Sequence, residues 1–203
     1  MKQTPFSLFI RQCLLYPLAS PFLPPENKVE KDYSYAAGQK TGTLEAGAGG
    51  GVPKTGQTTS YADYDDGYYQ KGYPKTGNRF TNNGDGTITD NATGLEWVAS
   101  PTAAGVGGTY AWADAITACE GLTYAGHSDW RLPNVKELQS IVDYGRVSPA
   151  IDTTYFTSES DLYWSSNTYA SITSFAWGVN FSYGNAPLVG KPGPFYARPV
   201  RGG

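Results

Sequence analysis

The chain has 203 residues, of which 39% are hydrophobic and 16% are charged. This length accommodates one globular domain plus additional chain, and the high glycine and aromatic content favours short strands and turns over long charged helices. The formal net charge is −3, but residues 164–203 contain Lys191, Arg198, Arg201 and no acid, so this region carries +3 and the remainder −6. Three scattered cations provide no track for a polyanion, which excludes nucleic acid from the expected partners.

The first 51 residues are expected to form an N-terminal arm and a glycine-rich linker, largely extended or disordered. Residues 1–25 include apolar stretches, but Arg11, Gln12 and several prolines interrupt them. They therefore predict neither a membrane span nor a typical signal peptide, although an export signal and a packing arm both remain open. Residues 36–51 read AAGQKTGTLEAGAGGG, a run that buries too little apolar surface to order itself. We therefore place the folded domain at residues 52–203.

A section rich in tyrosine and aspartate, residues 61–69, lies between two copies of Pro-Lys-Thr-Gly at 53–56 and 74–77. Two copies of four residues indicate a pair of similar turns and not a repeat architecture. The carboxylates of Asp63, Asp65 and Asp66 could hold a hard cation, but a solvated loop is the favoured interpretation.

Residues 79–98 predict a β-hairpin and a third strand. β-formers at 79–81 and 87–90 flank Asn-Asn-Gly-Asp-Gly, and a second turn at 91–94 leads into Leu-Glu-Trp-Val at 95–98. The loop around Asp85 superficially suggests a calcium site. It lacks the EF-hand register, because Thr81 stands at the first ligand position and Ala92 where a bidentate glutamate is needed, so a hairpin turn is favoured.

Two helices are predicted in the middle of the domain. Thr109 can cap the first, from about Tyr110 to Glu120, and Gly121 suits the position after its end. Its apolar face has helical spacing and makes the cysteine a buried thiol: Trp112, Ala115, Ile116 and Cys119. The second helix begins with a capping box of Asn134 and Glu137 and is expected to run through Asp143.

No catalytic, metal or cofactor site is predicted, so the chain is not expected to be an enzyme. His127, Ser128 and Asp129 are consecutive, and adjacent residues rarely converge on one reacting atom, so a turn is favoured. Neither Cys13 nor Cys119 has ligand spacing, and no glycine-rich phosphate loop of a standard form occurs.

Strands are expected near residues 163–167, 174–181 and 196–201. In the middle one, Trp177, Val179 and Phe181 alternate with Gly178, Asn180 and Ser182, which predicts one core face and one exposed face. The order of strands, two helices and strands indicates an α+β fold with the helices packed on mixed or antiparallel strands. The predicted core combines large apolar residues: Trp97, Trp112, Ile116, Trp130, Leu138, Ile141, Trp164, Trp177, Val179 and Phe181.

Between these frame residues the tail has no core periodicity, which is typical of a binding surface or of an ordinary surface loop. Tyr and Phe supply contact area at low rotamer cost, and Ser and Gly supply fit and hydrogen bonds. The candidate ligand-binding positions are Ile172, Ser174, Phe175, Gly178, Ser182, Tyr183, Ala186, Pro187, Leu188, Val189, Gly190, Pro192, Gly193, Pro194 and Phe195.

Several motifs in order, Gly-Leu-Glu-Trp at 94–97, Asp-Trp-Arg-Leu-Pro at 129–133, Lys-Glu-Leu at 136–138 and Tyr-Trp-Ser-Ser at 163–166, resemble the bacterial Lcl C-terminal domain family over about residues 53–203. The resemblance implies a C-type-lectin-like fold related to the formylglycine-generating-enzyme branch. Nothing in the tail matches the active cysteines of that enzyme branch, so no catalytic residue is transferred, and an oxidase-like activity is the third alternative.

The tail also resembles the variable region of a target protein of a diversity-generating retroelement, at about residues 164–201. Such elements turn AAY codons into NNY, which cannot encode Trp, Lys, Gln, Glu or Met. Between Ser165 and Arg201 only Trp177 and Lys191 belong to that excluded set. The resemblance implies a hypervariable ligand-binding protein at the cell surface, secreted or on a phage particle, with a protein or carbohydrate ligand.

The alternative is a fixed-specificity lectin or adhesin for surface polysaccharide or glycosaminoglycan, in which aromatic rings stack on sugars and Lys191 and Arg198 supply charge. One departure concerns the thiol. Many members of the family that the chain resembles carry a cysteine just before the last Val-Arg, able to form a disulfide with the cysteine of the first helix. Here Ala197 and Pro199 occupy that neighbourhood. This weakens the expectation of an oxidising compartment.

Overall fold

The computed structural model of the protein describes residues 52–74 and 79–203, so the predicted arm and linker at 1–51 lie outside the described residues. The described part is a mixed α+β structure with two sheets and short helices. Its helices are α3 (Asp66–Tyr69), α4 (Trp112–Glu120) and α5 (Val135–Ser140). The predicted α+β class is confirmed at this level.

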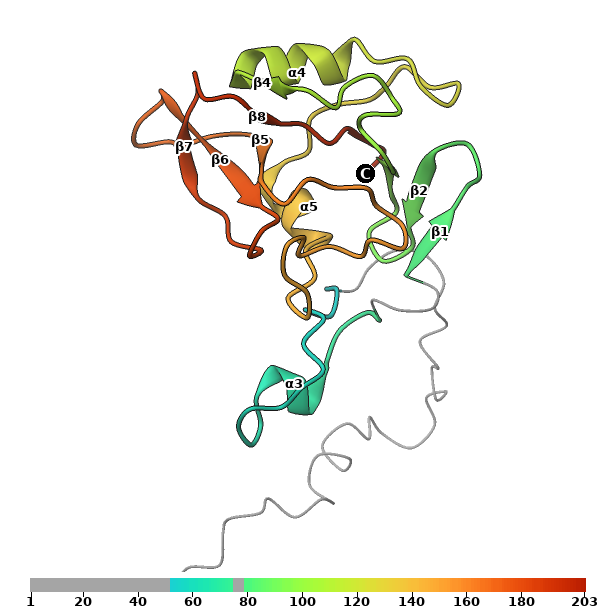
Figure 1. The fold of residues 1–203 in the computed structure, drawn as a ribbon, viewed down its shortest axis with the longest axis vertical. Coiled ribbons are helices and arrows are strands. Elements are labelled where there is room, and N and C mark those ends of the chain that lie inside the picture. The colour runs from blue at the N-terminus through green and yellow to red at the C-terminus, as the bar shows by residue number, and fades with distance from the viewer. Residues whose placement is uncertain (1–51, 75–78) are drawn as a thin grey trace, which may run out of the picture. The chain divides into compact units, whose positions relative to one another are not determined.

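One sheet has four antiparallel strands in the order β1-β2-β3-β9. They are β1 (Phe80–Asn82), β2 (Thr87–Asp90), β3 (Leu95–Val98) and β9 (Val200–Arg201). The predicted hairpin is confirmed, with Phe80 opposite Asp90 across the turn. Because Val200 pairs with Trp97, the C-terminus lies beside β3 (Figure 1).

The other sheet has five strands in the order β4-β8-β5-β6-β7. They are β4 (Thr109–Tyr110), β8 (Phe195–Tyr196), β5 (Leu162–Thr168), β6 (Phe175–Asn180) and β7 (Leu188–Gly190). It is mixed, because β5 and β8 pair in parallel at Tyr163 and Tyr196 and the other pairs are antiparallel. The single strand predicted at 196–201 is therefore wrong: the chain leaves this sheet after Tyr196 and enters the other at Val200.

Helix α4 has the predicted apolar face and the predicted end at Glu120, but not the predicted start. Ala115 and Cys119 are buried, and the half-buried Trp112 and Ile116 pack against the same cluster. Thr109 is not the cap, because it pairs with Tyr196 in the sheet; the N-cap is Ala111, which makes no side-chain cap bond. Gly121 follows the last helical residue, as predicted, and has right-handed backbone angles.

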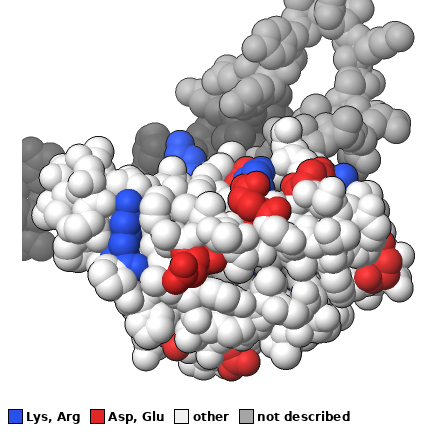
Figure 2. Space-filling model, turned by 90° about the horizontal axis from the view of Figure 1, so that it is seen from above, with Lys and Arg blue, Asp and Glu red and all other residues white. Residues whose placement is uncertain are grey.

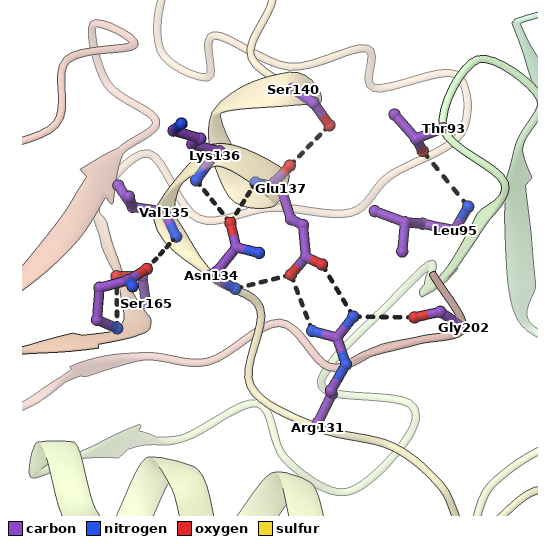
Figure 3. Close-up of polar contacts among 11 residues, drawn as sticks. Thr93, Leu95, Arg131, Asn134, Val135, Lys136, Glu137, Ser140, Ser165 and Gly202 are labelled. Carbon is purple, nitrogen blue, oxygen red and sulfur yellow. Dashed lines mark hydrogen bonds and ion pairs between the residues drawn. The ribbon is translucent and has the colours of Figure 1, made fainter. Parts of the chain in front are cut away.

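Helix α5 begins as predicted (Figure 3). The Asn134 side chain accepts hydrogen bonds from the N–H groups of Lys136 and Glu137, and the Glu137 carboxylate accepts the Asn134 N–H at 2.8 Å. The same carboxylate takes two bonds from Arg131, at 2.8 and 2.9 Å, and Arg131 also donates to the Gly202 carbonyl. The helix ends at Ser140 and not at Asp143. The capping box thus also anchors the chain terminus.

Hydrophobic clusters cover both faces of the five-stranded sheet. Tyr163, Val179 and Phe181 pack with residues of α5, whereas Trp164 and Ala176 pack with α4, and the two helices lie on opposite sides of the sheet (Figure 1). The predicted exposed face of β6 is therefore wrong where α4 covers it. Of the predicted core, Trp112, Ile116 and Trp177 are half-buried and the other members are buried.

Two arginines are fully buried. Arg79 forms a two-bond ion pair with Asp90, at 2.6 and 2.7 Å, and donates to the Ser140 carbonyl. Arg198 occupies the crossing between the two sheets, where it donates to the carbonyls of Val98 and Thr157 at 2.9 and 2.6 Å. Burial lowers the pKa of Arg198. Both residues satisfy buried backbone groups and so hold the framework.

Candidate ligand-binding surface

Three connections carry nine of the fifteen predicted ligand-binding positions: residues 169–174 between β5 and β6, 181–187 between β6 and β7, and 191–194 between β7 and β8. The other six lie in the strands themselves: Phe175, Gly178, Leu188, Val189, Gly190 and Phe195. The first and third connections lie at the start of β6, since Phe175 is opposite Gly190 and the Lys191 N–H donates to the Ser174 carbonyl at 2.9 Å. The second lies at the other end. Because a strand rises about 3.3 Å per residue, about 16 Å of β6 separates them.

The larger group, which we call the outer surface, consists of Ile172, Ser174, Phe175, Leu188, Val189, Gly190, Pro192, Gly193 and Pro194. Three of its apolar members are exposed to water, Ile172 by 52%, Phe175 by 37% and Leu188 by 36%, whereas Val189 packs against the hydrophobic cluster of α4. Leu188 lies opposite Trp177 across β6 and β7, so Leu188, Trp177 and Phe175 point to the same side of the sheet. These residues form an apolar surface at the β7 edge.

The smaller group consists of Ser182, Tyr183, Ala186 and Pro187, which we call the inner loop. Tyr183 is 70% exposed, but Ser182 is tied down by donating its hydroxyl to the Ser160 carbonyl at 2.6 Å. Ala186 packs against the core cluster that contains α5. The structure thus places the loop residues of the predicted surface at opposite ends of β6, and Pro187 and Leu188 join the two groups along its edge.

A family profile described as the Lcl C-terminal domain matches residues 86–201, from the hairpin turn to the last strand. The chain belongs to the Lcl C-terminal domain family. No curated protein matches it. Membership indicates a ligand-binding or adhesin-like domain.

One predicted position of this Lcl C-terminal domain is not available for contact. Gly178 is buried, and a Cβ atom there would lie 2.8 Å from Leu162 Cδ2 and 2.9 Å from the Tyr163 carbonyl oxygen. The cause is the close approach of β5 beneath it. Gly178 therefore belongs to the framework, and Phe195, whose ring packs edge-on against Trp164 at 5.2 Å, belongs to it in part.

Sequence reasoning missed the place of Tyr169 in the outer surface. Its ring meets that of Trp177 edge-on at 5.9 Å, and its N–H donates to the Phe175 carbonyl. Both rings are half-buried. One signal could have indicated this. Tyr169 is an aromatic residue directly after the end of β5, among the loop residues of the tail.

Lys191 fixes the outer surface to the framework of the Lcl C-terminal domain. Its Nζ lies 3.8 Å from the centre of the Trp112 ring and donates to Thr168 Oγ1 at 2.8 Å. Its carbonyl accepts the Trp112 N–H at 2.9 Å, and the Trp112 indole donates to the Ser165 carbonyl. One side chain thus connects the β7–β8 loop, the start of α4 and strand β5.

The other tail cations do not face a ligand. Arg198 is fully buried, so its predicted role in binding acidic polysaccharide is wrong. Arg201 forms ion pairs with Glu96 and Asp129, both at 2.8 Å, and the hydrogen bond from Arg201 lowers the pKa of Asp129. From Leu162 to Gly190 the sequence contains no charged residue. The outer surface is therefore neutral apart from Lys191.

Charged side chains form small separate groups on the side that carries α4, with no continuous basic patch in that view (Figure 2). His127 forms a two-residue bridge with Tyr124, which confirms a turn there. Among residues 52–74 and 79–203, no group of three His, Cys, Asp or Glu could hold a metal ion, and no helix is long and apolar enough to cross a bilayer.

The remaining acidic and thiol candidates have structural surroundings. Asp65 caps α3 by accepting the Tyr68 N–H at 2.8 Å, and its pKa is lowered, most by the backbone hydrogen bond from Tyr61. Cys119 is fully buried, and burial, aided by the charge of Glu120, raises its pKa to about 12. Ala197, where the resemblance led us to look for a second cysteine, lies in the same hydrophobic cluster as Cys119.

Proposed function

We propose that this Lcl C-terminal domain displays a ligand-binding surface that a diversity-generating retroelement varies, on a C-type-lectin-like fold exported to the cell surface, secreted or carried on a phage particle. The observation that carries the proposal is the separation of framework from surface in the tail. Between Ser165 and Arg201, mutated AAY codons cannot encode two of the residues: Lys191, which contacts Trp112 and Thr168 of the framework, and Trp177, which is half-buried in β6. The exposed large apolar side chains of the tail, in contrast, all occupy proposed variable positions: Ile172, Phe175, Tyr183 and Leu188.

This separation has a physical basis. A buried large apolar side chain stabilises the fold by roughly 2 to 3 kcal/mol, whereas a surface substitution away from specific interactions changes stability by about 0.5 kcal/mol or less. Trp164, Val179, Phe181 and Val200 are buried within the tail, and the exposed positions lie between them in sequence. A framework of this kind tolerates many side chains at the exposed positions.

The fixed-specificity lectin remains the second candidate because aromatic rings line the outer surface. Tyr169, Trp177 and Phe175 lie together and could stack on sugars. The two cations expected to bind the polysaccharide give this candidate less support, since Arg198 is buried and Lys191 is held by Trp112 and Thr168. An oxidase-like activity through Cys119 has less support, because the thiol is buried and its pKa is raised.

The deciding experiment is DNA sequencing around the gene. We expect a near-copy of the codons for residues 164–201 beside a reverse transcriptase gene, with AAY at the exposed positions such as Ile172, Phe175 and Tyr183. The structure adds a second expectation: the codons for Gly178 and Lys191 should be the same in the gene and in the near-copy, because both residues belong to the framework. A missing copy, or differences at bases other than adenine, leaves the fixed lectin as the better explanation.

Binding is tested separately with a library that varies only exposed tail positions. The proposal expects different members to select different ligands while their thermal unfolding temperatures stay close together. A matched library that varies Trp164, Gly178 and Val179 should instead yield few folded proteins. Retention of one ligand across the first library favours fixed specificity, and cell fractionation with surface proteolysis tests the proposed location.

A further inference from the structure

The segment before the family match contains a second exposed surface, which we call the tyrosine loop, residues 55–70. Four of its tyrosines are exposed, by 84% (Tyr61), 44% (Tyr64), 58% (Tyr68) and 49% (Tyr69). Single exposed apolar residues are ordinary, but a contiguous group of them marks an interaction site. Because the family match begins at residue 86, the tyrosine loop lies outside the matched residues.

Three of these rings form one group. Tyr68 meets Tyr64 at 5.5 Å and Tyr69 at 5.2 Å, both edge-on, and Tyr64 lies 6.1 Å from Tyr69. Tyr64 has a φ of 68°, a left-handed conformation that is uncommon for a bulky residue. These ring contacts create one aromatic surface from residues on both sides of the start of α3.

The tyrosine loop is held in shape before any partner binds. At its base Lys54 donates its N–H to the Tyr73 carbonyl, and Tyr73 donates to the Val52 carbonyl, both at 2.8 Å. The Tyr144 N–H donates to the Thr55 carbonyl at 2.7 Å, which fixes the base to the domain. Inside the loop, Gly67 is so close to the backbone that a Cβ atom would lie 2.1 Å from the Thr59 carbonyl oxygen.

The charge of the loop defines its partner. Residues 55–70 contain Asp63, Asp65 and Asp66 and no Lys or Arg. The Asp65 carboxylate accepts a hydrogen bond from the Tyr68 N–H, and the Asp66 carboxylate accepts one from the Thr55 hydroxyl. The Asp63 side chain is exposed and open to a partner. A cation at such a site is attracted by the charge of the carboxylates and also by the negative face of each tyrosine ring.

We propose that the tyrosine loop docks an arginine-bearing segment of a partner protein. Arginine fits better than lysine because its planar guanidinium stacks on aromatic rings while its N–H groups reach carboxylates. This inference does not depend on the function proposed for the tail.

The test uses the full chain and three dye-labelled octapeptides of alternating serine with arginine, lysine or glutamine, measured by fluorescence anisotropy. We expect the arginine peptide to bind at least about threefold tighter than the lysine peptide, and the glutamine peptide not to bind. Equal binding of the two cationic peptides overturns the proposal, because it shows attraction by net charge alone.

Variants locate the binding. Replacing Tyr64 and Tyr68 with serine should weaken the arginine peptide at least about fivefold, whereas phenylalanine at both positions should retain it within about twofold. Asp63→Asn should weaken both cationic peptides, and it leaves every bond inside the loop intact. Tyr183→Ser, which removes an exposed tyrosine from the inner loop, is the matched control and should change nothing.

Circular dichroism and thermal unfolding show whether each variant is folded, and the Asp63→Asn variant decides the question if the serine variant is not. Unchanged binding of the arginine peptide by a folded serine variant, or by the folded Asp63→Asn variant, removes the tyrosine loop as the site. A glycan array provides the other outcome: sugar binding that depends on Tyr64 and Tyr68 while the arginine peptide does not bind assigns the loop to carbohydrate and overturns the proposal.

Discussion

The Lys191 ammonium lies 3.8 Å from the centre of the Trp112 ring, between a loop of the proposed binding surface and the first turn of α4. Replacing Lys191 with alanine removes this contact and the bond to Thr168, so we expect the free energy of unfolding to fall by about 1 kcal/mol. Urea denaturation measures the loss. Hydrogen exchange should quicken at the Trp112 and Lys191 amides and stay unchanged in β2.

Two controls separate charge from packing at this position. Lys191→Arg keeps a cation over the ring and should remain within about 0.5 kcal/mol of the natural protein, whereas Lys191→Met keeps the stem and loses the charge. Equal stability of the methionine variant and the natural protein would show that the ammonium contributes nothing.

A substitution at Gly178 tests the boundary between framework and surface. Gly178→Val places atoms against Leu162 and the Tyr163 carbonyl, and because the carbonyl belongs to the backbone it cannot turn away. We expect a loss of about 1 to 3 kcal/mol, the usual cost of overpacking. Ser174→Val, an equally small residue made larger on the exposed side, should change stability by about 0.5 kcal/mol or less. Chemical denaturation of both proteins compares them directly, and a reversed order contradicts the assignment of Gly178 to the framework.

The thiol of Cys119 should be inert in the folded protein. Its pKa is raised to about 12, and the thiolate is the reactive form, so alkylation by iodoacetamide at pH 8 should require unfolding. Peptide mapping by mass spectrometry reports Cys119 separately from Cys13. Rapid labelling of Cys119 in native conditions would contradict the burial.

The same group affects stability in alkali. Because its folded pKa lies above the unfolded value of about 8.5, the stabilising effect is complete below that value. This stabilisation is lost as the pH rises toward 12, because the thiol ionises in the unfolded chain at a lower pH than in the folded protein. The Cys119→Ala variant should therefore show a shallower decline in stability above pH 9 than the natural protein.

Acid should weaken the link between Asp129 and Arg201. The hydrogen bond from Arg201 lowers the pKa of Asp129 in the folded protein, so its stabilising effect is present above about pH 4 and is lost as the pH falls through the lowered value. Urea midpoints measured between pH 7 and pH 3 should decline less for Asp129→Asn than for the natural protein. Identical slopes would indicate that this exposed pair makes no contribution.

Local signals predicted the elements that are built from neighbouring residues. The β1–β2 hairpin depends on its own turn, and α5 begins where the Asn134 and Glu137 side chains complete a capping box within four residues. Both were therefore readable from the sequence. Thr109 shows the opposite case, since its pairing with Tyr196 is made by residues far apart in the chain, and this pairing takes it out of the helix.

The candidate surface was predictable only in part for the same reason. Exposed tail residues such as Phe175 and Tyr183 stand out by type, but Gly178 appears equally exposed in an alternating pattern. What excludes it is the close approach of Leu162 and the Tyr163 carbonyl of β5, which the periodicity of the sequence does not reveal. Arg198 was placed on the surface because arginine is usually there, and three distant carbonyls, of Val98, Ala99 and Thr157, hold it inside.

The position of β9 makes the fold of the domain depend on its last residues. Val200 and Arg201 complete a sheet whose first strand starts at Phe80, so a polypeptide that ends early or is read out of frame anywhere in the tail lacks both these residues and Arg198. Its β3 edge stays unpaired and the space of the missing guanidinium stays empty, so we expect such a chain to be less stable than the intact domain.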